Sequence, residues 1–164
     1  MATVNPIPEG MHTVTPNLTL RDAAKAIDFY KRALGAQEVA RFPAPDGKSI
    51  WHAELKIGDS IFYVNDEMPG MSRPAPSAEN PVPVTMWLHV KDCDAAFDRA
   101  MKAGAKELGK PTDMFWGDRC AGVLDPFGYM WSFSTHTKDM TREEMQKAGE
   151  AFARQMQQQH GGGR

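Results

Sequence analysis

Alternating apolar and polar residues near the N-terminus predict a half-buried strand, and a helical pattern follows it. The apolar positions of this strand are Val14, Pro16, Leu18 and Leu20. Between Asp22, a favoured helix N-cap residue, and Gly35, a favoured C-cap residue, apolar residues recur at the spacing of one helix face. Three shorter strands are predicted next, at about 37–42, 49–57 and 60–65. The first part of the chain therefore reads as strand, helix and three strands.

The same order of elements recurs 70 residues later in the chain. Segments 15–22 and 85–92 align without a gap, and Gly47 and Gly58 match Gly117 and Gly128. A constant offset across separate local features indicates an internal duplication. We therefore predict an α+β fold in which two βαβββ modules form a cupped mixed sheet, with a C-terminal helix added.

Proline content and a helix start signal divide the chain further. A segment rich in proline separates the two copies, which argues against a central strand or helix there. Thr141 and Glu144 form a capping-box pattern, and apolar residues follow at helical spacing, so a C-terminal helix is expected to pack on a module or a partner subunit. The predicted parts are an N-terminal arm at 1–12, a first module at 13–67, a linker at 68–83, a second module at 84–136, and the C-terminal helix with a flexible tail at 137–164.

Strand parity divides each predicted strand into a face that meets the helices and a face that does not. In the strand at 49–57, the apolar set Trp51, Ala53, Leu55 and Ile57 is expected to meet a helix, which turns His52 and Glu54 the other way. A two-residue hairpin loop at Gly58 and Asp59 then pairs Tyr63 with Glu54, and Asn65 with His52. The same parity adds further residues to this second face: Thr15, Asn17, Thr85, Trp87, His89, Ser132, Ser134 and His136.

A sheet face that carries such polar and aromatic residues has two interpretations. It can be the solvated face of an antiparallel sheet, which is common. It can also curve around a ligand pocket, since pockets combine apolar walls with a few placed polar groups. We favour the pocket because Tyr63, Trp87, Phe115 and Trp116 are costly to expose to water.

Composition narrows the classes of partner. With 41% apolar and 24% charged residues, the chain resembles an ordinary soluble globular protein, and it has no apolar run long enough to span a membrane. The formal charge of -2 argues against nucleic acid as a partner. The N-terminus has no secretory pattern, so a cytoplasmic location is expected. Cys93 and Cys120 lack zinc-site spacing and are interpreted as reduced packing residues.

These features resemble the vicinal oxygen chelate superfamily, which includes glyoxalases, bleomycin resistance proteins and dioxygenases. The resemblance rests on the duplication, on the helix from Ile27 to Gly35, and on Asp125-Pro-Phe-Gly-Tyr129 before the last strand. His52-Ala-Glu54, Gly58-Asp-Ser60 and Phe115-Trp-Gly-Asp-Arg119 are similar to the branch labelled 3-demethylubiquinone 3-methyltransferase-like. The resemblance covers about residues 13–136 and implies a cupped sheet and a homodimer, in which modules are sometimes exchanged between subunits.

The resemblance also implies where a catalytic metal would be held. Metalloenzymes of the superfamily place His or Glu ligands at positions that correspond here to Thr15, Tyr63, Thr85 and Ser132. None of these is a good ligand for a divalent metal, so no metal or other cofactor is predicted at this set. The alternative is a relocated metal on His52 and Glu54, with His89 across the cup.

Without a metal, the same face offers acid–base chemistry. Glu54 beside Tyr63 in a partly apolar cup is a candidate general base, with His52 or His89 transferring a proton. Arg119 is a candidate for holding an anionic group, and its alternative is a salt bridge to Asp118 or Asp125. The predicted catalytic residues are Glu54, His52 and Tyr63; the predicted ligand-binding residues are Thr15, Asn17, Asn65, Thr85, Trp87, His89, Phe115, Trp116, Arg119 and Ser132.

Three functional hypotheses follow. The first is a homodimeric small-molecule-binding protein that sequesters a drug-like or aromatic compound without a metal. The second is a lyase, isomerase or dioxygenase-like enzyme that uses His52 and Glu54. The third is a structural or regulatory dimer with a vestigial cup.

Overall fold

Residues 4–72 and 74–160 are described by the structure, a computed structural model. The first module contains β1 (Asn17–Leu20), α1 (Ala23–Leu34), β2 (Gln37–Pro43), β3 (Ile50–Ile57) and β4 (Ser60–Asp66). Its strands form one four-stranded mixed sheet in the order β1-β4-β3-β2, in which the β1–β4 pair is parallel and the other pairs are antiparallel. The sheet has α1 against one face, and we call the other face the open face of the first module.

The second module repeats this topology. It contains β5 (Thr85–His89), α2 (Cys93–Ala103), β6 (Lys106–Asp113), β7 (Asp118–Leu124) and β8 (Met130–His136). The strand order is β5-β8-β7-β6, again with a parallel pair between the first and last strands. The predicted α+β fold of two βαβββ modules with a C-terminal helix is confirmed, and the eight strands are divided into two separate sheets.

Capping contacts explain why the helices begin and end where they do. The Asp22 carboxylate accepts a hydrogen bond from the Lys25 amide at 3.0 Å, and Asp92 accepts one from the Ala95 amide at 2.9 Å. Gly35 and Gly104 end the helices with φ of 70° and 109°, a backbone conformation that favours glycine. These four capping residues lie at matching places in the two copies, as the repeat predicts.

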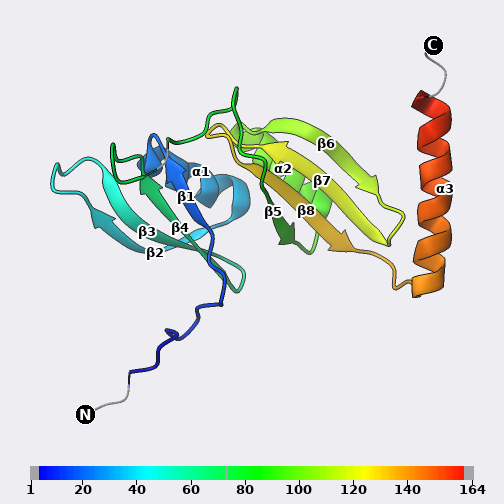
Figure 1. Ribbon diagram of the computed structural model, residues 1–164, viewed down its shortest axis with the longest axis horizontal. Helices are drawn as coiled ribbons and strands as arrows, with labels where there is room; N and C mark the ends of the chain where they lie inside the picture. The colour runs from blue at the N-terminus through cyan, green and yellow to red at the C-terminus, as the bar shows by residue number, and fades with distance from the viewer. Residues whose placement is uncertain (1–3, 73, 161–164) are drawn as a thin grey trace.

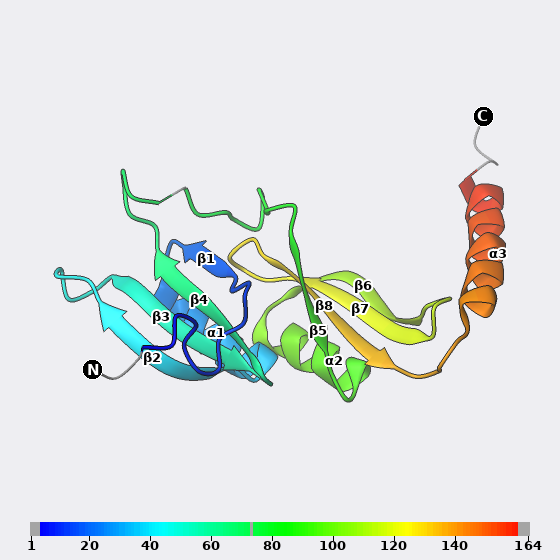
Figure 2. The ribbon, with the colours of Figure 1, turned by 60° about the horizontal axis from the view of Figure 1, so that its bottom comes forward.

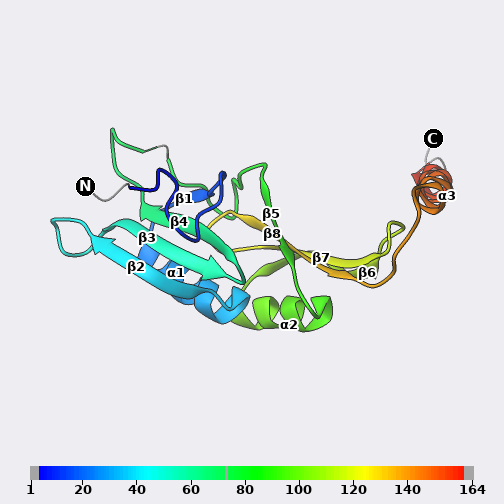
Figure 3. The same ribbon diagram turned by 90° about the horizontal axis from the view of Figure 1, so that it is seen from below.

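The two modules pack side by side through their helices and one buried carboxylate. α1 and α2 are in contact, and Figure 3 shows them next to each other on the same side of both sheets. Asp125 is 1% exposed and accepts hydrogen bonds from the Tyr30 hydroxyl of α1 and the Trp131 indole of β8, each at 2.9 Å. The rings of Tyr30 and Trp131 lie 5.4 Å apart. The core is therefore continuous from one module to the other.

The linker between the modules forms no helix or named strand in its described residues, as predicted. Figure 2 shows it running from β4 to β5. It is fixed at one point where Gly128, with φ of 94°, lies so close to Ser77 that a Cβ atom would clash with the Ser77 backbone. Its beginning contributes Met68 and Met71, which surround Trp51.

α3 (Arg142–His160) stands at the far end of the second module, as Figure 1 shows. Its start is the predicted capping box: the Thr141 amide donates to Glu144 at 2.8 Å, and the Glu144 amide donates to the Thr141 hydroxyl at 3.2 Å. Phe152 lies 5.4 Å from Phe115, which connects the helix to the module. The expected flexible tail at 161–164 lies outside the described residues. Among the described helices, none has the length and apolar character needed to cross a membrane.

Candidate functional site

A row of side chains crosses the open face of the first module, one from each strand. Strand register brings Tyr63 opposite Asn17 on one side and opposite Glu54 on the other, and Glu54 lies opposite Ala40. The predicted pairing of Tyr63 with Glu54 is therefore confirmed. We call this the first row: Asn17, Tyr63, Glu54 and Ala40.

His52 joins Glu54 and Tyr63 in a compact cluster on this face. The His52 Nε2 lies 3.4 Å from the Glu54 Oε1, and the His52 ring meets the Tyr63 ring edge to face at 4.6 Å. Phe42 from β2 stacks on the other side of His52 at 6.0 Å between ring centroids. The three predicted catalytic residues are thus neighbours, and the cluster combines a carboxylate, an imidazole and a phenol that can accept, transfer or donate a proton.

Two further polar residues extend this face. Asn65 follows Tyr63 on β4, and its side-chain amide donates to the Asp66 carbonyl oxygen at 2.9 Å. Thr15 precedes β1 and is half-buried. Both predicted ligand-binding residues therefore lie beside the cluster, Asn65 within the sheet and Thr15 just before its edge strand.

The second module has the equivalent row, but its chemistry is different. Register pairs Trp87 with Ser132, Ser132 with Gly122, and Gly122 with Gly109. We call this the second row: Trp87, Ser132, Gly122 and Gly109. Trp87 is 47% exposed. Where the first module presents an amide, a phenol, a carboxylate and a methyl group, the second presents an indole, a hydroxyl and two glycines.

Thr85 and His89 lie on the same face of β5 as Trp87, two residues to either side of it. Thr85 pairs with Met130, and His89 pairs with Ser134. Both side chains are exposed, as is Asn17 in the first row. Thr85, Trp87 and His89 therefore share the face of β5 that turns away from the helix, as predicted.

Asp118 joins the end of the second module into a hydrogen-bond network. It accepts hydrogen bonds from the Ser134 hydroxyl at 3.0 Å and the Trp116 indole at 3.2 Å, and His136 Nδ1 lies 2.8 Å away. The hydrogen bond with His136 holds the pKa of Asp118 below its usual value. The pKa of His136 is raised, first by Asp139, 3.0 Å from its Nε2, and then by Asp118.

Arg119, Phe115 and Trp116, three of the predicted ligand-binding residues, make contacts with other side chains of the protein. Arg119 donates to Asp94 of α2 at 2.5 Å and to Asp113 at 2.9 Å, rather than to Asp118 or Asp125. Parity is the reason, because Arg119 alternates with Asp118 and Cys120 and points to the helix side of β7. Phe115 packs on Trp116 and on α3. These contacts engage the three side chains within the chain.

The positions at which related metalloenzymes hold a metal do not provide a fitting donor set here. Tyr63 and Ser132 occupy equivalent sites in the two rows, Thr15 lies two residues before β1, and Thr85 is the first residue of β5. Neutral hydroxyl groups are poor ligands for divalent transition metals. Within the described residues, no three His, Cys, Asp or Glu side chains gather closely enough to hold a metal ion.

Sequence reasoning did not identify several residues that shape the open faces. Phe42 was missed because β2 is irregular, with register shifts on either side of the Ala40–Phe42 segment that break the alternation. Gly109 and Gly122 were not predicted as site residues because they have no side chain that could contact a ligand. Their positions inside predicted strands were nevertheless a signal in the sequence, since glycine weakens a strand and therefore indicates a special role there. Phe152 was predicted only as one of the apolar residues at helical spacing in the C-terminal helix.

The open faces of the two modules lie side by side. In Figure 3 both sheets have their helices on one side, so both open faces look out to the other side and neither closes over the other. An apolar groove of about 320 Å³ marks the seam between the modules, lined from both sides by residues such as Leu18, Phe62, Leu88 and Trp131. Trp87 stands at the border of this groove and the second open face.

Comparison with known proteins places this architecture in a family. Residues 11–133 match the family model described as the Glyoxalase/Bleomycin resistance protein/Dioxygenase superfamily, and this range contains both modules up to the core of the last strand. The chain belongs to that superfamily.

Members of the superfamily similar to this chain come from bacteria and plants. An uncharacterised protein of Mycobacterium tuberculosis H37Rv, Rv0887c, is 42% identical over 138 residues, which covers 82% of this chain and 81% of the relative. An Arabidopsis thaliana protein, At5g48480, is 32% identical over 127 residues, or 72% of this chain and 74% of the relative. Sequence similarity thus extends over both modules of the superfamily fold.

Solved structures show the same fold. TioX from Micromonospora sp. ML1 superposes with a TM-score of 0.62 at 28% identity, over 76% of this chain and 98% of the other. The fosfomycin resistance protein FosX from Listeria monocytogenes, solved with Mn(II) and sulfate, has a TM-score of 0.58 over 81% of this chain and 95% of the other. At 14% identity, that likeness concerns the fold alone.

Proposed function

We propose that this superfamily member binds and sequesters a small aromatic or drug-like compound on its open faces, without the divalent metal of its enzyme relatives. The observation that carries this proposal is the pair of equivalent rows. At matching positions, one row offers hydrogen-bonding groups around Glu54, and the other offers the half-exposed indole of Trp87. A ligand with a polar end and a flat apolar body fits this combination.

An enzyme is the second candidate, and the cluster of His52, Glu54 and Tyr63 favours it. With His52 Nε2 3.4 Å from the Glu54 carboxylate, a proton that Glu54 accepts from a substrate can pass to the imidazole. A lyase or isomerase activity fits this arrangement, and a dioxygenase-like activity would require a relocated metal on His52 and Glu54. The sequence motifs similar to the 3-demethylubiquinone 3-methyltransferase-like branch are kept as a subfamily proposal. Methyl transfer is not, because the sequence contains no GxGxxG cofactor loop.

We also propose that the protein acts as a cytoplasmic homodimer. The two open faces look out to the same side within one chain, so a cup with two opposed walls requires a second subunit. A dimer also covers the apolar seam, since exposed apolar patches commonly mark association sites.

The deciding experiment measures what the purified protein carries. After extensive dialysis, elemental analysis is expected to find well under one zinc, nickel, iron or manganese per chain. Native mass spectrometry of undialysed protein is expected to find an organic ligand. Stoichiometric metal that is lost in both His52→Ala and Glu54→Gln, but kept in the control Glu107→Gln, an exposed carboxylate on β6, would reverse the order of the two candidates.

A further inference from the structure

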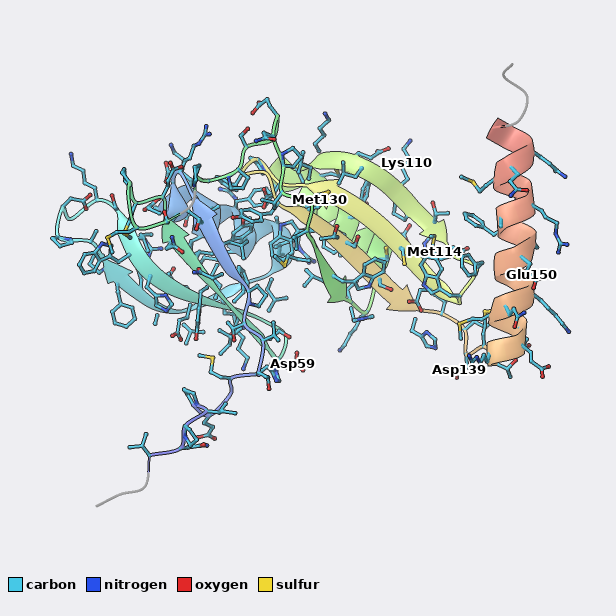
Figure 4. The ribbon with its side chains drawn as sticks, viewed as in Figure 1. Asp59, Lys110, Met114, Met130, Asp139 and Glu150 are labelled. Carbon is cyan, nitrogen blue, oxygen red and sulfur yellow. The ribbon has the colours of Figure 1, made fainter. Side chains whose placement is uncertain are left out.

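A cavity of about 400 Å³ lies between the open face of the second module and α3. Trp87 lines it from β5, Met114 from the end of β6, and Phe152 from α3. Figure 4 shows Met114 at the end of the second sheet that lies nearest α3, the helix that carries Glu150. Two aromatic rings and a thioether, which pack well on flat apolar molecules, thus line the cavity, and Lys110, Thr112 and Asp113 add polar groups along β6.

The strand surface that forms the floor of this cavity is unusually flat. Gly109 and Gly122 face each other across β6 and β7, and Ser132 lies next to Gly122 on β8. At the equivalent positions of the first row the chain has Ala40 and Glu54. The fold therefore accepts side chains at these positions, but the second module has glycine at both of them.

Packing within the chain does not require these two glycines, and of the two only Gly109 is flanked by register shifts of its strand. Neither has a positive φ. A Cβ atom built on Gly109 would meet nothing within 4 Å, and one on Gly122 would meet the Leu108 Cβ at an ordinary 3.6 Å. Glycine inside a strand lowers stability and often marks a place where a ligand approaches the backbone. The space above the two glycines is the cavity.

We propose that this cavity holds a planar fused-ring system, which lies flat on Gly109 and Gly122 between Trp87 and Phe152. The inference rests on the proposed function and adds to it the shape of the ligand and a role for α3. The polar end of the ligand then projects beyond the cavity, toward groups such as those of the first row. α3 is a wall of the binding site, held there through the contact between Phe152 and Phe115.

The test compares a flat probe with a globular one by isothermal titration calorimetry. 9-Aminoacridine is a planar three-ring amine, and 1-aminoadamantane is a compact amine that cannot lie flat. The full-length protein is expected to bind 9-aminoacridine and to bind 1-aminoadamantane at least tenfold more weakly. Gly122→Val fills the floor and is expected to weaken 9-aminoacridine at least tenfold, and Phe152→Ala to weaken it severalfold.

Two controls keep the result interpretable. Gln37→Val adds a valine at an exposed position of β2 that lines neither the cavity nor the first row, and is expected to leave 9-aminoacridine affinity unchanged. Because valine favours strands, Gly122→Val is expected to melt no lower than the original protein, and Gly109→Val serves as a second variant. The melting curves separate blocked binding from misfolding.

The outcomes distinguish the inference from the function beneath it. If the unaltered protein binds 9-aminoacridine and both glycine variants bind it equally well, the cavity is not the site, although small-molecule binding stands. If the unaltered protein binds neither probe, the inference and its support for the proposed function fall together. If Gly122→Val changes the sedimentation coefficient instead of the affinity, the flat floor accommodates a second copy of the chain, and the inference is overturned.

Discussion

At the scale of single residues, the buried carboxylate of Asp125 joins the two modules through the Tyr30 hydroxyl. One carboxylate oxygen accepts from the Phe127 and Tyr129 amides at 2.8 and 2.9 Å, and the other accepts from Tyr30 and Trp131. Burial raises the pKa of Asp125, and these hydrogen bonds oppose that rise. A buried carboxylate with four donors is stabilising only while all four remain.

Replacing Asp125 with Asn is therefore expected to destabilise the protein by about 3 kcal/mol, because in either orientation the amide nitrogen, itself a donor, faces two buried donors and leaves them unpaired. Tyr30→Phe removes only one of the four hydrogen bonds, and about 1 to 2 kcal/mol is expected. Urea unfolding at neutral pH measures both. Equal losses for the two variants would contradict this account, since it assigns the larger cost to the unsatisfied donors.

Local residue patterns predicted the helix ends but not Asp125. Asp22, Asp92 and the Thr141 capping box act within four residues of themselves, so the sequence alone exposes them. The contact of Asp125 with Tyr30 spans 95 residues, and only the folded chain brings the two together. From the sequence, Asp125 was predicted only as part of a motif similar to the superfamily and as an alternative partner of Arg119, which binds Asp94 and Asp113 instead.

At the scale of elements, the end of β8 holds the segment that leads into α3. The Thr137 and Lys138 amides both donate to the Gly117 carbonyl oxygen, at 2.9 and 3.0 Å. The His136 imidazole lies between Asp118 and Asp139, so both ring nitrogens face carboxylates. That arrangement favours the doubly protonated ring.

This attachment is expected to weaken as the pH rises. The pKa of folded His136 is raised above its usual value of 6.5. Its contacts with Asp118 and Asp139 therefore stabilise the folded protein fully below about pH 6.5, and this stabilisation is lost as the pH rises through the raised pKa. Hydrogen exchange at about pH 6 and pH 8.5, corrected for the intrinsic rate, should show less protection of the Thr137 and Lys138 amides at the higher pH. His136→Gln should remove the difference, and an unchanged pH dependence in that variant would exclude His136 as its source.

Strand parity predicted most of the open faces from sequence, because alternation survives wherever a strand is regular. The β3–β4, β5–β8 and β7–β8 pairings have unbroken register, and His52, Tyr63 and Trp87 lie on the expected face. Parity also assigned Trp51 to the helix side, but this ring lies toward the end of β3 beside Met68 and Met71, and is 50% exposed. The register shift between β2 and β3 skips Trp51, since Phe42 pairs with His52 and Pro43 with Ile50, so alternation fails at this residue.

At the scale of the whole molecule, β1 and β5 are edge strands that lie at the seam between the two modules and do not pair with each other. β1 pairs only with β4, and β5 only with β8, within the described sheets. Val14 and Val84 precede these strands at equivalent positions and are 80% and 53% exposed. Unpaired edges beside an apolar groove are natural places for association.

A dimer is therefore expected in sedimentation velocity at micromolar concentration. Val14→Asp combined with Val84→Asp should shift it to monomer, because two charges then face the association surface. Val39→Asp is the matched control, since Val39 is 54% exposed on the outer edge strand β2. Dissociation by the control alone would move the interface to the outer edges, and a monomeric unaltered protein would contradict the proposal.

Ligand binding can be located on the whole molecule through its tryptophans. Trp87 lies on the second open face, and Trp116 is held by Asp118 at the end of the same module. Trp131 is buried on the helix side, and Trp51 lies apart from the open faces beside Met68 and Met71. A bound planar probe such as 9-aminoacridine should therefore quench part of the tryptophan emission, and the quenched part should disappear in Trp87→Leu.

Trp87→Leu should also weaken binding by about 1 to 3 kcal/mol, because it removes a stacking surface, with a small effect on the melting temperature since the ring is half-exposed. Trp51→Leu is the control of equal size and similar exposure, and it should leave the affinity unchanged. If Trp51→Leu instead abolishes binding while the fold stays intact, the ligand occupies the pocket of Trp51, Met68 and Met71, and the open faces lose their assigned role.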